Sequence, residues 1–148
     1  MPLTSGNSLL VRPAQLADLT PIKALADAHR HELGFVLLPS LREQMERGQM
    51  LVAEQDGTLL GFVDYHRRRD GQITLYHIVV KPGVRGQGTG RALLAALEAC
   101  GRDANCRRIV LKCPIDLASN HFYERYGFIL DGTIEGRKRP LNVWMLNL

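Results

Sequence analysis

The segment that most restricts the fold of this chain is VVKPGVRGQGTGRALLAALEA, residues 79–99. A β-branched pair leads into Lys-Pro-Gly, glycines then alternate at positions 86, 88 and 90, and a run rich in alanine and leucine follows at once. Glycine lacks a Cβ and adopts positive φ readily, so alternating glycines let successive backbone N–H groups turn toward one point. At the start of a helix, such groups add to the positive end of the helix dipole. The segment therefore predicts a strand, an anion-binding loop and a helix.

Two common phosphate motifs do not fit this loop. The dinucleotide fingerprint G-x-G-x-x-G requires a glycine three places after its second glycine, and no alignment of the loop supplies one. The phosphate loop G-x-x-x-x-G-K-[ST] fails because Thr89 stands in place of its lysine. The pattern that fits is R-x-x-G-x-G, formed by Arg85, Gly88 and Gly90 after a strand that ends in Val-x-Pro. Nucleotide hydrolysis is therefore disfavoured.

Hydrophobic periodicity divides the rest of the chain into strands and helices. The expected strands cover residues 8–13, 50–55, 58–67, 72–81, 107–113, 128–134 and 141–148. The expected helices start at the N-caps Asp18 and Ser40, run from the glycines to about Asp103, and cover residues 120–126. The order strand, helix, strand between residues 72 and 113 implies a parallel pair with a right-handed crossover. An α/β (α+β) fold accounts for these elements, with a mixed, mostly antiparallel sheet, a parallel central pair and helices on both faces.

Length and composition fit a single domain over residues 1–148. The chain is 45% hydrophobic and 23% charged, and no repeat or Pro/Gly-rich linker divides it. No signal peptide is recognised at residues 1–13, and no apolar run is long enough to cross a bilayer, so no membrane partner is expected. The cysteines Cys100, Cys106 and Cys113 fit neither a C-x-x-C site nor a disulfide framework. A reducing cytoplasm is therefore the expected location.

Charge clusters give weaker signals about function. The formal net charge is +4, with basic runs at Arg67–Arg69 and Arg137–Arg139 beside turn residues. Such runs attract anions or nucleic acid, or they keep a hairpin soluble. Nucleic acid is disfavoured because no base-stacking aromatic residues are interleaved. A metal site at His29, His31 and Glu32 is also disfavoured, since residues i and i+2 do not face each other on a helix.

Several segments together resemble one protein family. The segment IVVKPGVRGQGTGRALL resembles the acetyl-CoA pyrophosphate motif of the GNAT superfamily of N-acetyltransferases. LLVRPAQLADL is similar to the opening strand and helix of that family, and NHFYERYGF, residues 120–128, to its helix after the fifth strand. The resemblance extends over nearly the whole chain. It implies a GNAT-type fold, acetyl-CoA as co-substrate, and direct transfer of the acetyl group to a primary amine without a metal.

The resemblance also implies which residues hold acetyl-CoA. The main chain of the strand before the loop bonds the pantetheine arm, and the backbone N–H groups of the loop hold the pyrophosphate. The residues carried over are Ile78, Val79 and Val80 for the arm, and Arg85, Gly86, Gln87, Gly88, Thr89 and Gly90 for the pyrophosphate, with Arg91 completing the helix start. A side chain at Gly88 or Gly90 should therefore obstruct the ligand.

Tyr123 matches the family tyrosine that serves as general acid. A phenol with a pKa of about 10 keeps its proton at neutral pH, yet it can donate to a thiolate whose thiol has a pKa of about 8.5. The alternative is that Tyr123 only packs beside Phe122 and Phe128. Asn120 lies one helical turn earlier on the same face and could bond the coenzyme arm. Many family members place an asparagine where this chain has Asp116, which leaves the start and the cap of this helix open.

The general base is where the family pattern breaks. Related enzymes often carry a glutamate on the fourth strand, and QITLYHIVV contains no carboxylate. His77 is the nearest titratable candidate, because a neutral imidazole can accept a proton near neutral pH. Glu54, Asp64 and His66 on neighbouring strands, or ordered water, remain alternatives. The missing carboxylate also supports a second hypothesis, in which the chain is a coenzyme A-binding sensor that has lost its catalytic activity.

The acceptor amine is left open by the sequence. In the family it is set by the first two helices, the loop between them and the last hairpin, and these segments carry both signs of charge here. A small molecule, a peptide or protein N-terminus and a lysine side chain all remain candidate acceptors. A homodimer is compatible with the sequence.

Overall fold

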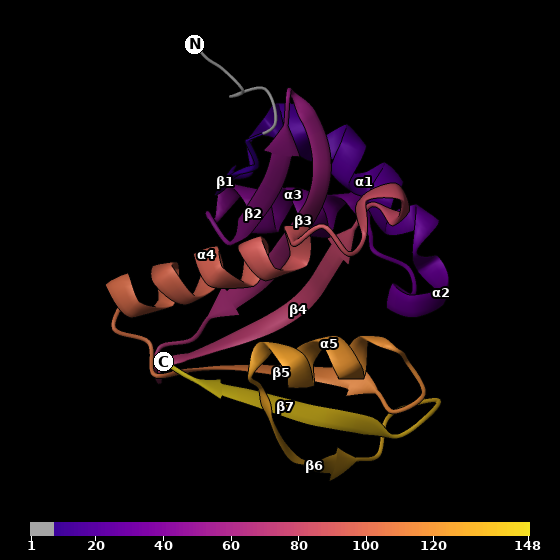
Figure 1. Cartoon of the computed structure of the whole chain (residues 1–148), viewed down its shortest axis with the longest axis vertical. Coiled ribbons are helices and arrows are strands. Elements are labelled where there is room, and N and C mark those ends of the chain that lie inside the picture. The colour runs from indigo at the N-terminus through magenta and orange to yellow at the C-terminus, as the bar shows by residue number, and fades with distance from the viewer. Residues whose placement is uncertain (1–7) are drawn as a thin grey trace. The chain divides into compact units, whose positions relative to one another are not determined.

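The structure, a computed structural model, describes residues 8–148 of the chain (Figure 1). Residues 1–7, part of the stretch considered for a signal peptide, lie outside the described residues. The strands are β1 Leu10–Pro13, β2 Met50–Gln55, β3 Thr58–Arg67, β4 Gln72–Val80, β5 Arg108–Pro114, β6 Ile129–Ile134 and β7 Leu141–Asn147. The helices are α1 Leu19–Ala28, α2 Arg30–Leu33, α3 Leu38–Glu46, α4 Thr89–Asp103 and α5 Ser119–Tyr126, with 3-10 turns η2 Leu16–Asp18 and η3 Pro82–Val84.

The strands form one mixed sheet in the order β1-β2-β3-β4-β5-β7-β6. β1 pairs with β2, β2 with β3, β5 with β7 and β6 with β7, all antiparallel. β4 and β5 pair in parallel, from Gln72 opposite Arg108 to Leu75 opposite Leu111, and α4 lies between them in the chain. The expected mixed sheet with a parallel central pair is therefore confirmed.

The chain divides into two compact units. The first unit extends to Tyr65 and includes His77–Leu97, and the second comprises His66–Tyr76 and Glu98–Leu148. β3, β4 and α4 therefore contribute residues to both units. A single domain over residues 1–148 stays a prediction.

The core of the first unit lies where α1 and α3 cover β2, β3 and the end of β4. Its buried side chains are Leu19, Ile22, Ala26, Val36, Leu41, Met45, Met50, Val52, Phe62 and Val79. On the other face, a Cβ at Gly61 would lie 2.6 Å from the Val79 carbonyl oxygen and 3.4 Å from Cδ1 of Leu93 on α4. Glycine is therefore required at position 61, where strand β4 and helix α4 both approach β3 closely. The expected helices on both faces of the sheet are present in this unit.

The second unit packs α5 beside β5 and β7 (Figure 1). Ile109 and Leu111 of β5, Trp144 of β7 and Phe128 before β6 are all buried. β6 lies at the edge of the sheet, and all of its residues are exposed.

All three cysteines lie in the second unit and carry thiols rather than disulfides. Cys106 and Cys113 are buried. Partial burial raises the pKa of the Cys100 thiol, and the negative charge of Asp103 adds to that rise while Arg67 opposes it.

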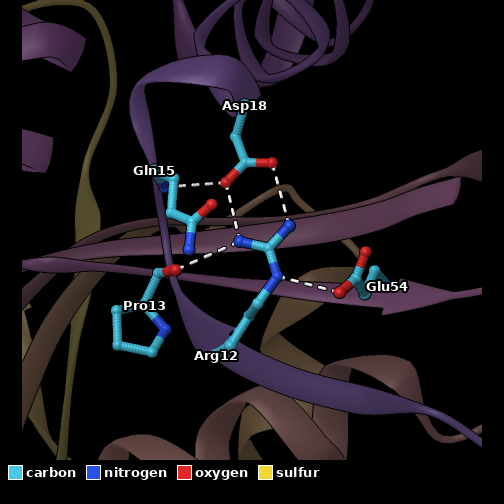
Figure 2. A network of polar contacts seen from close by, with 5 residues as sticks. All are labelled: Arg12, Pro13, Gln15, Asp18 and Glu54. Atoms are coloured by element: carbon cyan, nitrogen blue, oxygen red, sulfur yellow. Dashed lines mark hydrogen bonds and ion pairs between the residues drawn. The ribbon is translucent and has the colours of Figure 1, made fainter. Parts of the chain in front are cut away.

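Arg12 is the centre of a network of polar contacts (Figure 2). Its Nη1 and Nη2 donate to the two carboxylate oxygens of Asp18 at 2.8 and 3.0 Å, and its Nε donates to Glu54 on β2 at 2.9 Å. The hydrogen bonds from Arg12 lower the pKa of Asp18, and they raise the pKa of Arg12 itself. This network joins β1 to β2 and to the start of α1.

One of the two expected helix starts is confirmed and the other is wrong. α1 begins at Leu19 with Asp18 at its N-cap position, although the Asp18 side chain makes no bond to the first turn of that helix. Its carboxylate instead accepts from Arg12 and, at 2.7 Å, from the Gln15 N–H (Figure 2). Ser40 is not an N-cap, because α3 begins at Leu38 and places Ser40 inside the first turn. Pro39 explains the earlier start, since its fixed φ and missing N–H suit the first turn of a helix.

Candidate functional site

The glycine segment forms the loop that the sequence predicts at the start of a helix. η3 ends at Val84, Arg85 is extended, and α4 begins at Thr89 and continues for 15 residues. Gly86 and Gly88 have φ values of +85° and +86°, a region that other residues rarely adopt. Apart from the residues adjacent in the chain, no heavy atom of the described residues lies within 4 Å of a Cβ built at either glycine, so the space beside the loop is open.

Arg85, the first residue of the loop, is held by the end of helix α1. Its Nη2 lies 2.6 Å from Nε2 of His29 and 3.9 Å from Oε1 of Glu32, and its Nε donates to the Val80 carbonyl oxygen at 3.4 Å. His29 is buried, with 4% of its surface exposed, and its Nδ1 lies 2.9 Å from the Leu25 carbonyl oxygen. The loop is thus connected both to β4 and to the end of α1.

The candidate residues for the pantetheine arm occupy the last part of β4. The parallel ladder with β5 uses only Gln72–Leu75 of this strand, which continues to Val80. The side chain of Val79 is buried in the core of the first unit, whereas Ile78 and Val80 are partly buried. The contribution of their main chain to coenzyme binding stays a prediction.

His77 has a partner that the sequence did not assign to it. Its Nδ1 lies 2.9 Å from Oδ1 of Asp64, which reaches it from the neighbouring strand β3. The Asp64 side chain is 6% exposed and the His77 side chain 25% exposed. A carboxylate accepts hydrogen bonds, so a neutral His77 carries its proton on Nδ1 and presents Nε2 as an acceptor.

The alternative bases have other partners or remain unassigned. Asp64 is buried and bonded to His77, and Glu54 is paired with Arg12 at 2.9 Å. His66, which the sequence placed on the same face as Asp64, belongs to the second unit and is partly buried. Among the carboxylates and histidines proposed from the sequence, only His77 is partly exposed and held by a buried carboxylate.

Tyr123 lies on α5 in the second unit and is buried, with 7% of its surface exposed. Its ring packs against Phe122 and Phe128, with centroids 5.5 and 5.8 Å apart. The packing expected as the alternative reading is therefore present, and the acid role of the hydroxyl stays a prediction. The hydroxyl of Tyr126, one turn later, donates to Glu98 on α4, which gives Tyr126 a structural contact.

Asn120 joins α5 to two strands. Its Nδ2 donates to the carbonyl oxygens of Leu117 at 2.7 Å and Pro114 at 2.9 Å. Its Oδ1 accepts from Nε1 of Trp144 at 2.8 Å and from Nδ2 of Asn142 at 3.1 Å. These contacts give Asn120 a clear structural role, and its contact with the coenzyme stays a prediction.

Asp116 does not cap α5. The helix begins at Ser119, after Ala118, and Ala118 makes no side-chain cap. The Asp116 carboxylate instead accepts from Nη1 of Arg139 at 2.9 and 3.2 Å. Arg139 of the second basic run therefore forms an ion pair within the second unit.

The candidate residues divide between the two units. The first unit contains His77, Ile78–Val80 and the loop Arg85–Arg91, and the second contains Asn120 and Tyr123. Sequence reasoning missed the contacts that Asp64 and His29 make with these residues, although it noted both positions. No local pattern marks such contacts, because the partners lie 13 and 56 residues apart.

The described part of the chain contains neither a metal-binding cluster nor a membrane-spanning helix. Over residues 8–148, no group of three or more His, Cys, Asp or Glu side chains could hold a metal ion. In the same part of the chain, no helix is long and apolar enough to span a membrane. The cytoplasmic location stays a prediction.

Comparison with known protein sequences finds relatives over most of the chain. The sequence model of the acetyltransferase (GNAT) family matches residues 18–128. The chain is 31% identical over 90 residues to an aminoglycoside N(6')-acetyltransferase type 1 from Stenotrophomonas maltophilia. That match covers 54% of this chain and 58% of the enzyme, so it spans little more than half of either protein.

Two crystal structures share the fold over nearly their full length. The ribosomal-protein-alanine N-acetyltransferase from Brucella melitensis is 26% identical with a TM-score of 0.79, and the match covers 94% of this chain and 99% of that one. The PaiA N-acetyltransferase from Thermoplasma acidophilum, in complex with coenzyme A, is 18% identical with a TM-score of 0.83. That match covers 95% of this chain and 99% of the other.

Proposed function

This chain belongs to the acetyltransferase (GNAT) family, and we propose that it transfers the acetyl group of acetyl-CoA directly to a primary amine. The acceptor is a small molecule, a peptide or protein N-terminus, or a lysine side chain. Two relatives support transfer to nitrogen, since one is named an aminoglycoside N(6')-acetyltransferase and the other a ribosomal-protein-alanine N-acetyltransferase.

The observation that carries the proposal is the loop at the start of α4. Positive φ at Gly86 and Gly88 turns backbone N–H groups of the loop, and the space beside both glycines is open. The 15-residue helix that follows adds its positive dipole end at the same place. A diphosphate is the kind of ligand that such a loop binds. The similar PaiA enzyme has been crystallised with coenzyme A, which supports the same ligand here.

His77 is the proposed general base. Bound acetyl-CoA supplies an acetyl thioester, whose carbonyl carbon bonds to the amine nitrogen while its bond to sulfur breaks. The attacking nitrogen must lose a proton, and His77 accepts it on Nε2. The 2.9 Å contact with Asp64 holds the ring in the tautomer that this step needs and stabilises the positive charge that the ring gains.

Tyr123 is the proposed general acid. The departing sulfur leaves as a thiolate and needs a proton, which the Tyr123 hydroxyl donates and then regains from water. The ring is fixed by Phe122 and Phe128, so the hydroxyl keeps one direction during the reaction. The amine thus loses one proton, the thiolate gains one, and no covalent enzyme intermediate forms.

The experiment that tests the proposal combines purified protein, acetyl-CoA and a panel of amines. The panel contains aminoglycosides, polyamines, amino acids and peptides with alanine at the N-terminus. Release of coenzyme thiol together with an acetylated product, identified by mass spectrometry, would support the proposal. Tight coenzyme A binding by calorimetry without turnover of any amine would support the sensor instead. Absence of coenzyme binding would contradict both functions.

A further inference from the structure

We propose that His29 is a positioning residue for coenzyme binding, which acts through Arg85 at the start of the glycine loop. The proposal rests on the proposed function, because it takes the loop as the site of the coenzyme pyrophosphate. The observation that carries it is the 2.6 Å contact between Nε2 of His29 and Nη2 of Arg85.

The contacts of His29 fix the position of its proton. Nδ1 lies 2.9 Å from the Leu25 carbonyl oxygen, which only accepts hydrogen bonds, so Nδ1 carries the hydrogen. Nε2 is then an acceptor, which is what a guanidinium requires, since arginine only donates. The imidazole that fits this site is therefore neutral, with one nitrogen donating and the other accepting.

The site of His29 keeps the ring in place. His29 ends α1 and is 4% exposed. His31 stacks beside it, with ring centroids 6.4 Å apart and 20° between the planes. Glu32 lies near both Arg85 and His31, since its Oε1 is 3.9 Å from Nη2 of Arg85 and 3.2 Å from Nε2 of His31.

Arg85 transmits this arrangement to the loop. Its backbone lies directly between η3 and Gly86, and its guanidinium is held by His29 on α1 and by the Val80 carbonyl oxygen on β4. Restricting Arg85 in this way orders the loop before a ligand arrives, which lowers the entropy lost on binding. Without the acceptor on His29, that ordering has to occur at the moment of binding, and coenzyme affinity falls.

The test compares three variants by calorimetry with coenzyme A. His29→Asn retains an amide donor for the Leu25 carbonyl but cannot reach Arg85, and its Kd should rise about tenfold. His29→Gln places a non-titrating carbonyl oxygen near the position of Nε2, so its Kd should stay close to that of the wild type. Lys23→Gln is the control, because Lys23 lies on α1, the helix that ends at His29, but pairs with Asp27; its Kd should not change.

A further measurement separates positioning from general damage to the fold. At saturating acetyl-CoA, kcat of His29→Asn should match the wild type while KM for acetyl-CoA rises.

A double-mutant cycle decides whether Arg85 carries the effect. In an Arg85→Ala background, His29→Asn should cause no further rise in Kd. An equal rise in both backgrounds, or folded His29→Asn with the affinity of the wild type, would overturn the positioning role. If the wild type itself fails to bind coenzyme A, the proposed function has failed instead, and the two failures are thereby distinguished.

Discussion

Asp64 and His77 face each other from neighbouring strands, with 2.9 Å between Oδ1 of the carboxylate and Nδ1 of the ring. The aspartate is almost completely buried and the histidine is partly exposed. One group thus fixes the orientation of the other, and the ring keeps its second nitrogen for chemistry. This arrangement supports the proposal that His77 serves as the base on a fourth strand that has no carboxylate.

Removal of the His77 imidazole should lower kcat strongly. We expect His77→Gln to lose about 10²–10⁴-fold in kcat, with a smaller change in KM for acetyl-CoA, because a general base contributes by that factor to the chemical step. Steady-state thiol release at saturating acetyl-CoA measures the change. His66→Gln is the matched control. A greater loss of kcat in His66→Gln than in His77→Gln would identify His66 as the base instead.

Loss of the Asp64 carboxylate should affect the same step through the ring. Asp64→Asn should lower kcat less than His77→Gln and should have no further effect when combined with it. Additive losses in the double variant would show that Asp64 acts independently of His77.

Removal of one hydroxyl from α5 should separate catalysis from stability. Tyr123→Phe should lower kcat about 10²-fold or more, since it removes the proposed proton donor while preserving the ring contacts. Tyr126→Phe should preserve kcat and instead lower the free energy of unfolding by about 1–2 kcal/mol, because it removes the bond to Glu98. Activity assays and denaturant unfolding of both variants check the pair. Equal kcat values for Tyr123→Phe and the wild type would assign Tyr123 to packing alone.

A methyl group added to the glycine loop should weaken coenzyme binding. Gly88→Ala should raise the Kd for coenzyme A at least tenfold, because it strains the backbone at φ +86° and fills the space beside the loop. Gly57→Ala is the control for strain, since Gly57 has φ +80° and the same open surroundings but lies in the turn between β2 and β3. Both variants should lose about 1 kcal/mol of stability. If Gly57→Ala weakens binding equally, the effect comes from stability and not from the loop.

The Arg12–Asp18 pair should make stability depend on acid. Arg12 lowers the pKa of Asp18 below its ordinary value of 3.8, so the unfolded chain binds the proton more readily than the folded one. The stabilisation is therefore fully present above the ordinary pKa and is lost as the pH falls through the folded pKa. Asp18→Asn should cost about 1–3 kcal/mol at neutral pH, and the difference from the wild type should shrink in acid.

A control for this prediction is Asp27→Asn. Asp27 pairs with Lys23 at 2.6 Å, but its side chain is 37% exposed. Solvent screens such a pair, so its loss should cost less than about 0.5 kcal/mol at neutral pH. Urea unfolding at several pH values compares the two variants, and a difference between Asp18→Asn and the wild type that stays constant with pH would contradict the linkage.

The sequence predicted the elements that depend on local signals. The strand, glycine loop and helix from residue 72 to Asp103 carry strand, turn and helix signals within a few residues of one another, and the structure has them in that order. The parallel pairing of β4 with β5 followed from that order alone. Near α3 two local signals competed, and the prediction there was wrong. Ser40 was expected to cap the helix, but Pro39 favours an earlier start and α3 begins at Leu38.

The side-chain pairs could not be predicted because they depend on register and packing. Arg85 contacts His29 across 56 residues of chain, and Asn120 contacts Trp144 across 24. Sequence periodicity assigns such residues to a face of an element but not to a partner on another element. The polar contacts of the candidate site are therefore findings of the structure, whereas the loop that carries it was predictable.

The protected thiols of the second unit bear on how turnover is measured. Aromatic disulfide reagents react with thiolates, and a thiol with a raised pKa or without access to solvent reacts slowly. Cys106 and Cys113 are buried and the pKa of Cys100 is raised, so the enzyme itself should contribute little colour to such an assay. A continuous readout of released coenzyme should therefore work even at the high enzyme concentrations that weakly active variants require.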